Sequence, residues 1–315
     1  MKRTLPISVL IPTMNRPETL KRTLDTYMSA EYLPSQIVVV DQSNNENDSR
    51  RIRDIVSACE EIDAVYVYQA TPSLTAARNN ALHYAKEDIL VGSDDDVDVY
   101  TDTIYRLYNV MKEKDVAMVA GLDDNSKRKN GWIGYFLGTR SFKKRKIGHV
   151  TPSVLGRFPD EVKGQIDTEW AMGFFFSVKK SLVQKWGIEW DENLTSYAYA
   201  EDLDFSFAYY KKAKAEGLRC IYDENVHVKH MASQEYRIPS KKSTYMYVLN
   251  RAYLSHKHHM GIKSKIAMSW CNFWRLIERM IKRQAPRDMM RSMRRVSMLK
   301  RNKYKELSSL YNDEM

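Results

Sequence analysis

Hydrophobic positions along residues 1–125 follow two alternating patterns. Short apolar runs rich in β-branched residues end in polar turns, and the segments between them carry apolar residues three and four positions apart. The short runs predict strands at 7–11, 36–41, 64–70 and 88–93. The spaced segments predict helices that begin near residues 17, 48 and 71, with Thr71 and Pro72 opening the third. Strands that alternate with helices predict right-handed crossovers and a mainly parallel sheet of the α/β class.

Polar residues follow several of these predicted strands at the point where each strand ends. Pro12 and Thr13 come after the first strand, Asp41 ends the second, and the triplet 94–96 follows the fourth. Ligands of such sheets bind at the carboxyl ends of the strands. The sequence therefore predicts a nucleotide site at this edge of the sheet.

The triplet itself consists of three consecutive carboxylates, Asp94, Asp95 and Asp96. Like charges this close raise one another's pKa and destabilise the site unless a cation or hydrogen bonds compensate them. Mg²⁺ and Mn²⁺ bind carboxylate oxygens together with substrate phosphates. The triplet therefore predicts a divalent metal site, and an acidic turn is the alternative.

Asp41 and Arg78 each have two interpretations. Asp41 can accept a hydrogen bond from a nucleotide base or ribose, or it can simply end its strand in a turn. Arg78, a little more than one turn into its helix, can reach a pyrophosphate, or it can be a solvated residue on the helix surface. Both alternatives remain open at this point.

Composition and cysteine content narrow the class of protein. With 315 residues of which 43% are hydrophobic, the chain can form a large core and is not a disordered protein. Its three cysteines, far apart and odd in number, indicate neither a disulfide framework nor a zinc site. No apolar leader follows Met1 and no apolar run is long enough to span a membrane. We expect a cytoplasmic protein, free or peripheral on the cytosolic face of a membrane.

The net charge of +10 is concentrated near the C-terminus. Residues 240–305 contain 18 Lys and Arg against two acidic residues. This change of composition near Pro239 predicts two parts, a catalytic domain over 1–238 and a basic helical extension over 239–315.

Within the extension, apolar residues at helical spacing form a stripe with Lys and Arg opposite, and Pro286 separates it from a second basic helix. The stripe consists of Ile262, Ile266, Trp270, Phe273, Trp274, Ile277 and Ile281. These helices are expected either to pack on the catalytic domain or on a sister subunit of a homo-oligomer, or to contact an anionic membrane surface through 262–305. No nucleic-acid-binding motif accompanies the charge, so no nucleic-acid partner is expected.

Five blocks of the sequence, spread over about residues 5–235, resemble in content and order the inverting GT-A glycosyltransferases of family 2, which assemble bacterial polysaccharides and glycans. The blocks are "ISVLIPTMNRPETLKRTLDT", "QIVVVDQSNN", "TAARNNALHYAKEDILVGSDDDV", "AMGFFFSVKKSLVQKWGIEWDENL" and "AYAEDLDFSFAYYKKA". The order of the blocks is more specific than any single block. The resemblance implies a Rossmann-like GT-A domain.

The resemblance also implies roles at the predicted sheet edge. Nucleoside contacts would come from Pro12, Thr13, Asn15 and Asp41, with Asp41 reading the base, commonly uracil. Arg78 corresponds to the family's contact with the diphosphate or nucleoside. The triplet resembles the DxD motif, in which Asp96 binds the divalent ion and Asp94 or Asp95 contacts the ribose; three adjacent aspartates leave the register open.

Glu201 and Asp202 resemble the family's ED motif, whose aspartate is the general base. The amphipathic stretch that follows places both at a helix N-terminus, where the dipole favours the ionised carboxylates. Without the resemblance, the pair would be an ordinary acidic helix start. The family usually has glycine before the pair, where this chain has Ala200.

Two further regions complete the expected site. His227 and His230 point to opposite faces of a predicted strand, and the resemblance favours His230 as a metal ligand. Trp170 and Gly173 are the expected acceptor contacts: Trp170 and Met172, just before Gly173, can form an apolar platform for a sugar ring, or they can pack in the core.

The resemblance implies a transferase that depends on Mn²⁺ or Mg²⁺. It would move a hexosyl or N-acetylhexosaminyl group, with inversion, from a nucleotide-diphosphate sugar, commonly a UDP-sugar, to a hydroxyl of a glycan or lipid-linked glycan. A sugar nucleotidyltransferase is one alternative, but it needs a glycine-rich phosphate loop where this chain has "PTMNRPE". A non-catalytic carbohydrate- or nucleic-acid-binding protein on the same scaffold is another; loss of the DDD or ED residues would support it, and both are present.

Overall fold

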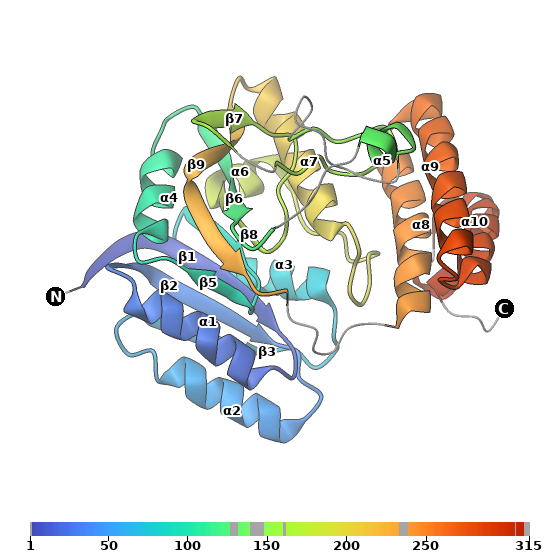
Figure 1. Cartoon of the computed structure of the whole chain (residues 1–315). Helices are drawn as coiled ribbons and strands as arrows, with labels where there is room; N and C mark the ends of the chain where they lie inside the picture. Colours follow the sequence, from blue (N-terminus) through green and yellow to red (C-terminus); the bar gives the residue numbers. More distant parts are fainter. Residues whose placement is uncertain are drawn as a thin grey trace.

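A computed structural model describes residues 2–126, 132–138, 148–159, 162–232, 239–305 and 307–311 (Figure 1). Its strands are β1 (Arg3–Thr13), β2 (Tyr32–Asp41), β3 (Asp63–Tyr68), β4 (Ile89–Ser93), β5 (Val97–Val99), β6 (Val116–Asp123), β7 (Gln165–Asp167), β8 (Phe175–Lys179) and β9 (Arg219–His230). Its α-helices are α1 (Pro17–Ser29), α2 (Glu46–Ser57), α3 (Leu74–Tyr84), α4 (Thr103–Met111), α5 (Trp132–Phe136), α6 (Lys180–Trp186), α7 (Glu201–Ala215), α8 (Ser240–Lys257), α9 (Gly261–Ile281) and α10 (Pro286–Arg301).

The strands form one mixed sheet in the order β3-β2-β1-β4-β8-β6-β9-β5, with β7 paired to β9. Neighbours from β3 to β4 run parallel, as do β6 and β9, whereas β8 is antiparallel to both of its neighbours. β5 and β7 run antiparallel to β9. The predicted α/β class with a mainly parallel sheet is confirmed.

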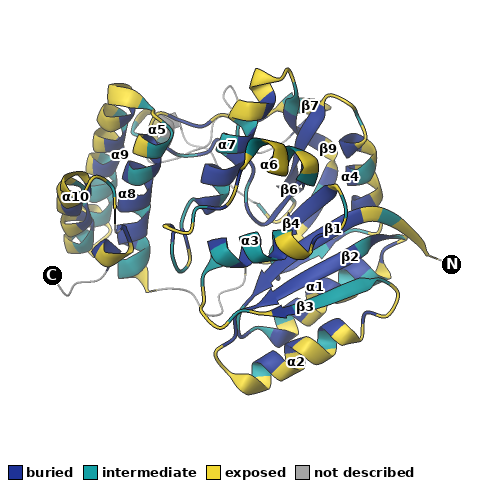
Figure 2. Cartoon of the chain, turned by 180° about the vertical axis from the view of Figure 1, so that it is seen from behind, coloured by how far each residue is buried: buried dark blue, intermediate teal, exposed yellow. Residues whose placement is uncertain are grey.

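The central strands are buried on both faces, which explains their continuous apolar runs. Helices α1 and α2 lie on one face, and α3 and α6 come to the front when the molecule is turned round (Figures 1 and 2). Register pairs Thr13 with Asp41 and Leu10 with Gly92. The carboxyl ends of β1, β2 and β4 therefore lie side by side, as expected for the candidate site.

The start of α3 differs from the prediction. The helix begins at Leu74, because the side chain of Ser73 accepts a hydrogen bond from the Ala76 amide at 3.4 Å and so acts as the N-cap. Thr71 and Pro72 remain in the loop before it. The Ser73 cap, and not Pro72, therefore sets the start of α3.

The last helices form a separate group beside the α/β part of the chain (Figure 1). Helix α8 attaches this group: Asp204 of α7 accepts hydrogen bonds from Lys257 and His258, each at 2.7 Å. Arg251, fully buried, donates to the Ser153 carbonyl at 2.8 Å. The predicted boundary near 238 falls in 233–238, outside the described residues. None of the helices in the described part of the chain combines the length and hydrophobicity needed to cross a bilayer.

Candidate functional site

The aspartate triplet fills the tight connection between β4 and β5. Asp94 and Asp96 present their carboxylates beside the His230 imidazole, and the three possible ligand atoms lie within 4.8 Å of one another. Carboxylate oxygens with one imidazole nitrogen suit Mn²⁺ and are compatible with Mg²⁺. The residues present therefore fit a divalent ion, and the geometry favours the register in which Asp94 and Asp96 form the motif.

Asp95 points the other way, into the protein, and is 3% exposed. It accepts hydrogen bonds from Thr13 Oγ1 at 2.7 Å and from an Arg16 nitrogen at 2.8 Å. Burial raises the pKa of Asp95 to about 7 against the opposing effects of Arg16 and Thr13. Asp95 and Thr13 thus hold the end of β1 to residues 94–96, the metal loop. Direct contacts of Asp95 and Thr13 with the nucleotide donor remain predictions.

Arg16 is the residue that the sequence analysis missed. Its guanidinium lies 2.8 Å from Asp95 and 3.4 Å from Asp96, so it offsets part of the charge of the triplet. The signal was present in the sequence: the loop after the first strand reaches the same sheet edge as the triplet, and Arg16 is its only cation.

The two histidines of β9 lie on opposite faces, as predicted. His230 Nε2 is 3.2 Å from Asp96 Oδ1, and its ring stacks on Phe174 with a centroid separation of 5.0 Å. Burial lowers the pKa of His230, but the hydrogen bond and charges of the nearby aspartates outweigh it and the pKa is raised. His227 instead lies 2.7 Å from Asp124, away from the cluster.

Arg78 connects the metal loop to the start of α7. The side chain is only 3% exposed, so the alternative of a solvated surface arginine is wrong. One terminal nitrogen lies 3.1 Å from both Asp94 and the Gly173 carbonyl, and Nε lies 3.3 Å from Glu201. A contact between Arg78 and a diphosphate remains a prediction.

Glu201 and Asp202 form the first turn of α7, at the helix N-terminus that the pattern predicted. Asp202 accepts hydrogen bonds from the backbone amides of Gly173, at 3.0 Å, and Leu203, at 2.7 Å. Burial raises the pKa of Glu201 to about 8 and also raises the pKa of Asp202. Desolvation therefore opposes the helix dipole, which was expected to favour the ionised carboxylates, and it is the larger effect on both pKa values.

Asp41 is fully buried and already bound by protein donors. Its oxygens accept hydrogen bonds from the Ser43 amide at 2.9 Å, the Ser49 hydroxyl at 2.5 Å and the Tyr66 hydroxyl at 2.9 Å. This arrangement favours the alternative of a strand-ending turn aspartate. A role in reading the base stays a prediction.

Asn15 and Pro12 stand at the same edge. Asn15 has a positive φ of 55° and donates to the side chain of Asn44 at 2.9 Å, which joins the loops after β1 and β2. Pro12, buried in β1, pairs with Val40. Contacts of either residue with a nucleoside remain predictions.

Comparison with known proteins decides the family. The sequence model of glycosyl transferase family 2 matches residues 8–185, more than half of the chain. The protein belongs to this family. Among proteins with curated descriptions, no sequence matches it.

Solved glycosyltransferases share its fold. The mannosyltransferase PcManGT from Pyrobaculum calidifontis, in complex with GDP-Man and Mn²⁺, has a TM-score of 0.55 at 13% identity, over 97% of this chain and 84% of that one. S. aureus TarS 1-349 has a TM-score of 0.53 at 16% identity, over 84% and 71%. GalNAc-T7 with UDP, GalNAc and Mn²⁺ has a TM-score of 0.54 at 16% identity, over 84% and 54%. These likenesses show the GT-A fold.

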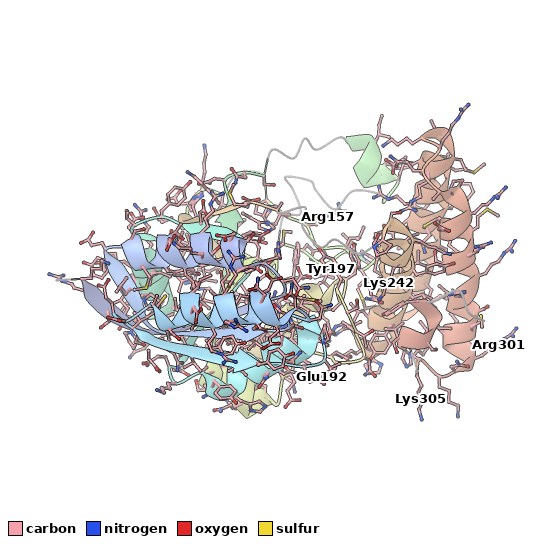
Figure 3. All side chains as sticks on the ribbon, turned by 90° about the horizontal axis from the view of Figure 1, so that it is seen from below. Arg157, Glu192, Tyr197, Lys242, Arg301 and Lys305 are labelled. Carbon is pink, nitrogen blue, oxygen red and sulfur yellow. The ribbon has the colours of Figure 1, made fainter. Side chains whose placement is uncertain are left out.

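In this family 2 glycosyltransferase, the position before the ED pair has a left-handed backbone. Ala200 has φ 68° and ψ 23°, a region in which glycine is the least strained residue. Ser196 and Ala198 in the same loop also have positive φ, of 63° and 50°. Lys242 of α8 donates to Ser196 Oγ at 3.2 Å, and Figure 3 shows Tyr197 and Lys242 at the junction with the C-terminal helices.

Gly173 and Trp170, both predicted to contact the acceptor, have different surroundings. A Cβ atom at Gly173 would lie 3.0 Å from an Arg78 nitrogen and 3.2 Å from a Glu201 oxygen, so the close approach there favours glycine. Trp170 is 6% exposed, and its indole donates to the Arg157 carbonyl at 3.3 Å. Of the two alternatives for Trp170, the structure favours the second: the ring is part of the core of this glycosyltransferase and not a sugar platform.

Proposed function

We propose that this protein is a metal-dependent inverting glycosyltransferase that acts on a nucleotide-diphosphate sugar, preferably a UDP-sugar. It transfers a hexosyl or N-acetylhexosaminyl group to a hydroxyl of a glycan or lipid-linked glycan. One observation carries the proposal: Arg78 and Gly173 join the cluster of Asp94, Asp96 and His230 to the carboxylate of Asp202. Solved neighbours were captured with GDP-Man, UDP-GlcNAc or UDP, two of them with Mn²⁺, which supports a donor of this class.

The donor end of the proposed site combines the metal cluster with fixed cations. Asp94, Asp96 and His230 would hold Mn²⁺ or Mg²⁺, which when bound neutralises charge on a diphosphate leaving group. Thr13 and Arg16 fix the loop through Asp95. Arg78 adds a buried positive charge at the side of the cluster that faces α7.

The acceptor end depends on Asp202. The acceptor hydroxyl oxygen attacks the anomeric carbon as the bond to the diphosphate breaks, and the hydroxyl proton passes to the carboxylate. A single displacement of this kind inverts the anomeric centre. The amides of Gly173 and Leu203 hold the carboxylate in one orientation. Burial raises its pKa, which makes the ionised form a stronger base.

The two parts of the chain have different proposed roles. Residues 1–238 would form the catalytic domain and 239–315 a helical extension. Every residue of the proposed reaction lies before position 238, and the extension is attached to α7 through Asp204.

Thermal unfolding with UDP and MnCl₂ tests this function. We expect the two together to raise Tm, because a ligand that binds only the folded state stabilises it by about 2.7 kcal/mol at a hundred times its Kd. Asp96→Ala should lose the effect. Asp124→Ala is the matched control, since Asp124 also pairs with a histidine of β9 but lies outside the cluster.

If neither UDP nor GDP raises Tm with the metal, the proposed function is wrong. A positive result leads to a panel of nucleotide sugars, in which hydrolysis or transfer detected by mass spectrometry identifies the donor. The anomeric configuration of the product, read by NMR, then tests inversion.

A further inference from the structure

Helix α9 presents its large apolar side chains to solvent. Ile262, Ile266, Phe273 and Ile281 have exposed fractions of 67%, 64%, 48% and 78%. Their spacings of four, seven and eight residues place them on one continuous face of the helix. A helix that packs only on its own protein buries such a face. Helix α9 instead exposes its apolar face to solvent.

The buried face of α9 carries mainly small or polar side chains, Ser264, Cys271 and Asn272, with Met268 as its one large apolar residue. Ser264 Oγ lies 2.7 Å from Ser255 Oγ of α8, and Asn272 accepts a hydrogen bond from Arg251 at 3.1 Å. Cys271 Sγ donates to the Gly138 carbonyl at 2.7 Å. These contacts attach the helix without using the apolar stripe.

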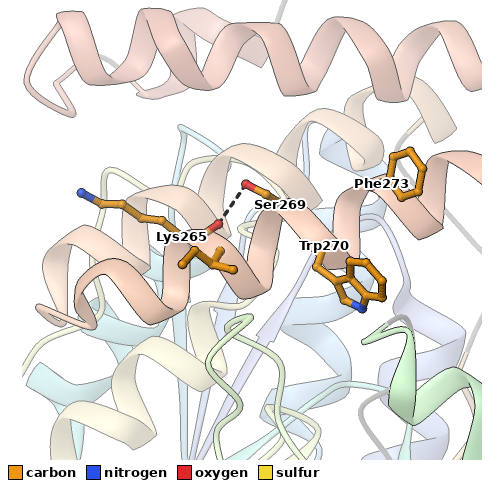
Figure 4. Close-up of a pocket in the computed structure, with 5 residues that line it drawn as sticks. Lys265, Ser269, Trp270 and Phe273 are labelled. Carbon is orange, nitrogen blue, oxygen red and sulfur yellow. Dashed lines mark hydrogen bonds between the residues drawn. The ribbon is translucent and has the colours of Figure 1, made fainter.

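Helix α5 extends the exposed surface. Phe136, 67% exposed, packs edge-on against Trp270 with a centroid separation of 6.4 Å, and Ile133 beside it is also exposed. A shallow open groove runs along this part of α9, and Figure 4 shows its lining. We call this surface the α9 stripe; it consists of Ile133, Phe136, Ile262, Ile266, Trp270, Phe273 and Ile281.

The charge around the stripe indicates its partner. Lys263 and Lys265 are exposed on its flanks, and Lys282 and Arg283 are exposed where α9 ends. A second copy docked on the same face would bring these like charges together, which opposes a symmetric dimer. A nucleic acid would satisfy the cations but would leave isoleucine and aromatic side chains without an apolar partner. An anionic lipid surface offers phosphates to the cations and acyl chains to the apolar side chains.

We propose that the α9 stripe docks the protein on membrane surfaces that contain anionic lipid. Helix α9 lies in the plane of the interface, with the stripe at the boundary of the acyl chains and Lys263 and Lys265 at the lipid phosphates. This inference does not rest on the proposed transfer reaction.

Co-sedimentation with vesicles tests the proposal. We expect the protein to sediment with vesicles of phosphatidylcholine and phosphatidylglycerol more than with phosphatidylcholine alone, and less as salt is added. Ile266→Ser with Phe273→Ser should weaken binding about tenfold or more at unchanged charge. Lys263→Gln with Lys265→Gln should weaken binding only to the anionic vesicles.

The matched control is Tyr84→Ser with Tyr105→Ser, which removes two exposed large side chains from the α/β part and should bind as the wild type does. The Ile266→Ser, Phe273→Ser variant should keep the unfolding temperature of the wild type and any increase in Tm with UDP and Mn²⁺. That readout separates a failure of lipid docking from a failure of the proposed enzyme function.

Three results would overturn the docking proposal. One is equal vesicle binding by the wild type and the Ile266→Ser, Phe273→Ser variant. Another is a wild-type dimer in sedimentation equilibrium without vesicles that this variant converts to a monomer, which would make a second copy the occupant. The third is binding to DNA that the variant retains, with no binding to anionic vesicles.

Discussion

Asp202 is the residue on which the proposed chemistry depends most directly. Asp202→Asn preserves the shape of the side chain but removes the basic oxygen. We expect the rate of sugar transfer to fall by about 10²–10⁴-fold, the usual contribution of a general base. Binding of UDP with Mn²⁺, measured by thermal shift, should stay near the wild-type value. Equal transfer rates for the two proteins would assign the base to another residue.

Glu201 links stability to pH. Because burial raises its pKa from 4.5 to about 8, the folded protein holds a proton that the unfolded chain releases between these values. Stability should therefore fall as the pH rises through this window. Glu201→Gln should show a smaller decline between pH 5 and pH 8 in urea denaturation without divalent ions. An unchanged decline would show that Glu201 does not titrate there.

At this scale the sequence predicted which groups meet but not where each side chain points. It placed Thr13, Asp41 and the triplet at one edge of the sheet and the ED pair at a helix N-terminus, and it separated His230 from His227. It could not show that Asp95 turns inward, because that direction depends on Thr13 and Arg16, which are about 80 residues away in the chain. Nor could it decide whether Trp170 offers a platform for a sugar or packs in the core.

At the scale of elements, the loop before α7 stores backbone strain at Ala200. Ala200→Gly should raise the free energy of unfolding by about 0.5–1 kcal/mol, because a left-handed L-residue costs about 1–2 kcal/mol and the flexibility of glycine offsets part of this. Denaturant unfolding measures the change. Ala208→Gly, inside α7, is the control and should lose about 1 kcal/mol. A loss of stability at both positions would contradict the strain at Ala200.

The order of strands and helices in the first half of the chain could be predicted, because each buried strand is a short apolar run and each helix has apolar residues three and four positions apart. The pairing of the later strands was not. β8 enters the sheet between β4 and β6 and antiparallel to both, and nothing in its local apolar run specifies those neighbours. Partner choice depends on packing across the sheet.

At the scale of the whole molecule, Asp204 fastens the C-terminal helices to the α/β part. Its side chain is 2% exposed and bonded to Lys257 and His258. Asp204→Asn should reduce the free energy of unfolding by about 1–3 kcal/mol, because it weakens the hydrogen bond from buried His258, whereas Lys257, 34% exposed, keeps Asp191 as a partner. Denaturant unfolding tests this. Asp25→Asn, in an exposed pair with Lys21, should have little effect, and an equally small effect at Asp204 would contradict its docking role.

A single peptide unit at Gly173 restrains both ends of the site. Its amide hydrogen holds Asp202 and its carbonyl oxygen holds Arg78, which in turn touches Asp94. Backbone movement there displaces the two ends together. In the proposed mechanism, engineering that changes donor preference through the backbone before β8 should therefore alter acceptor turnover as well, and screens for new specificity should score both properties in each round.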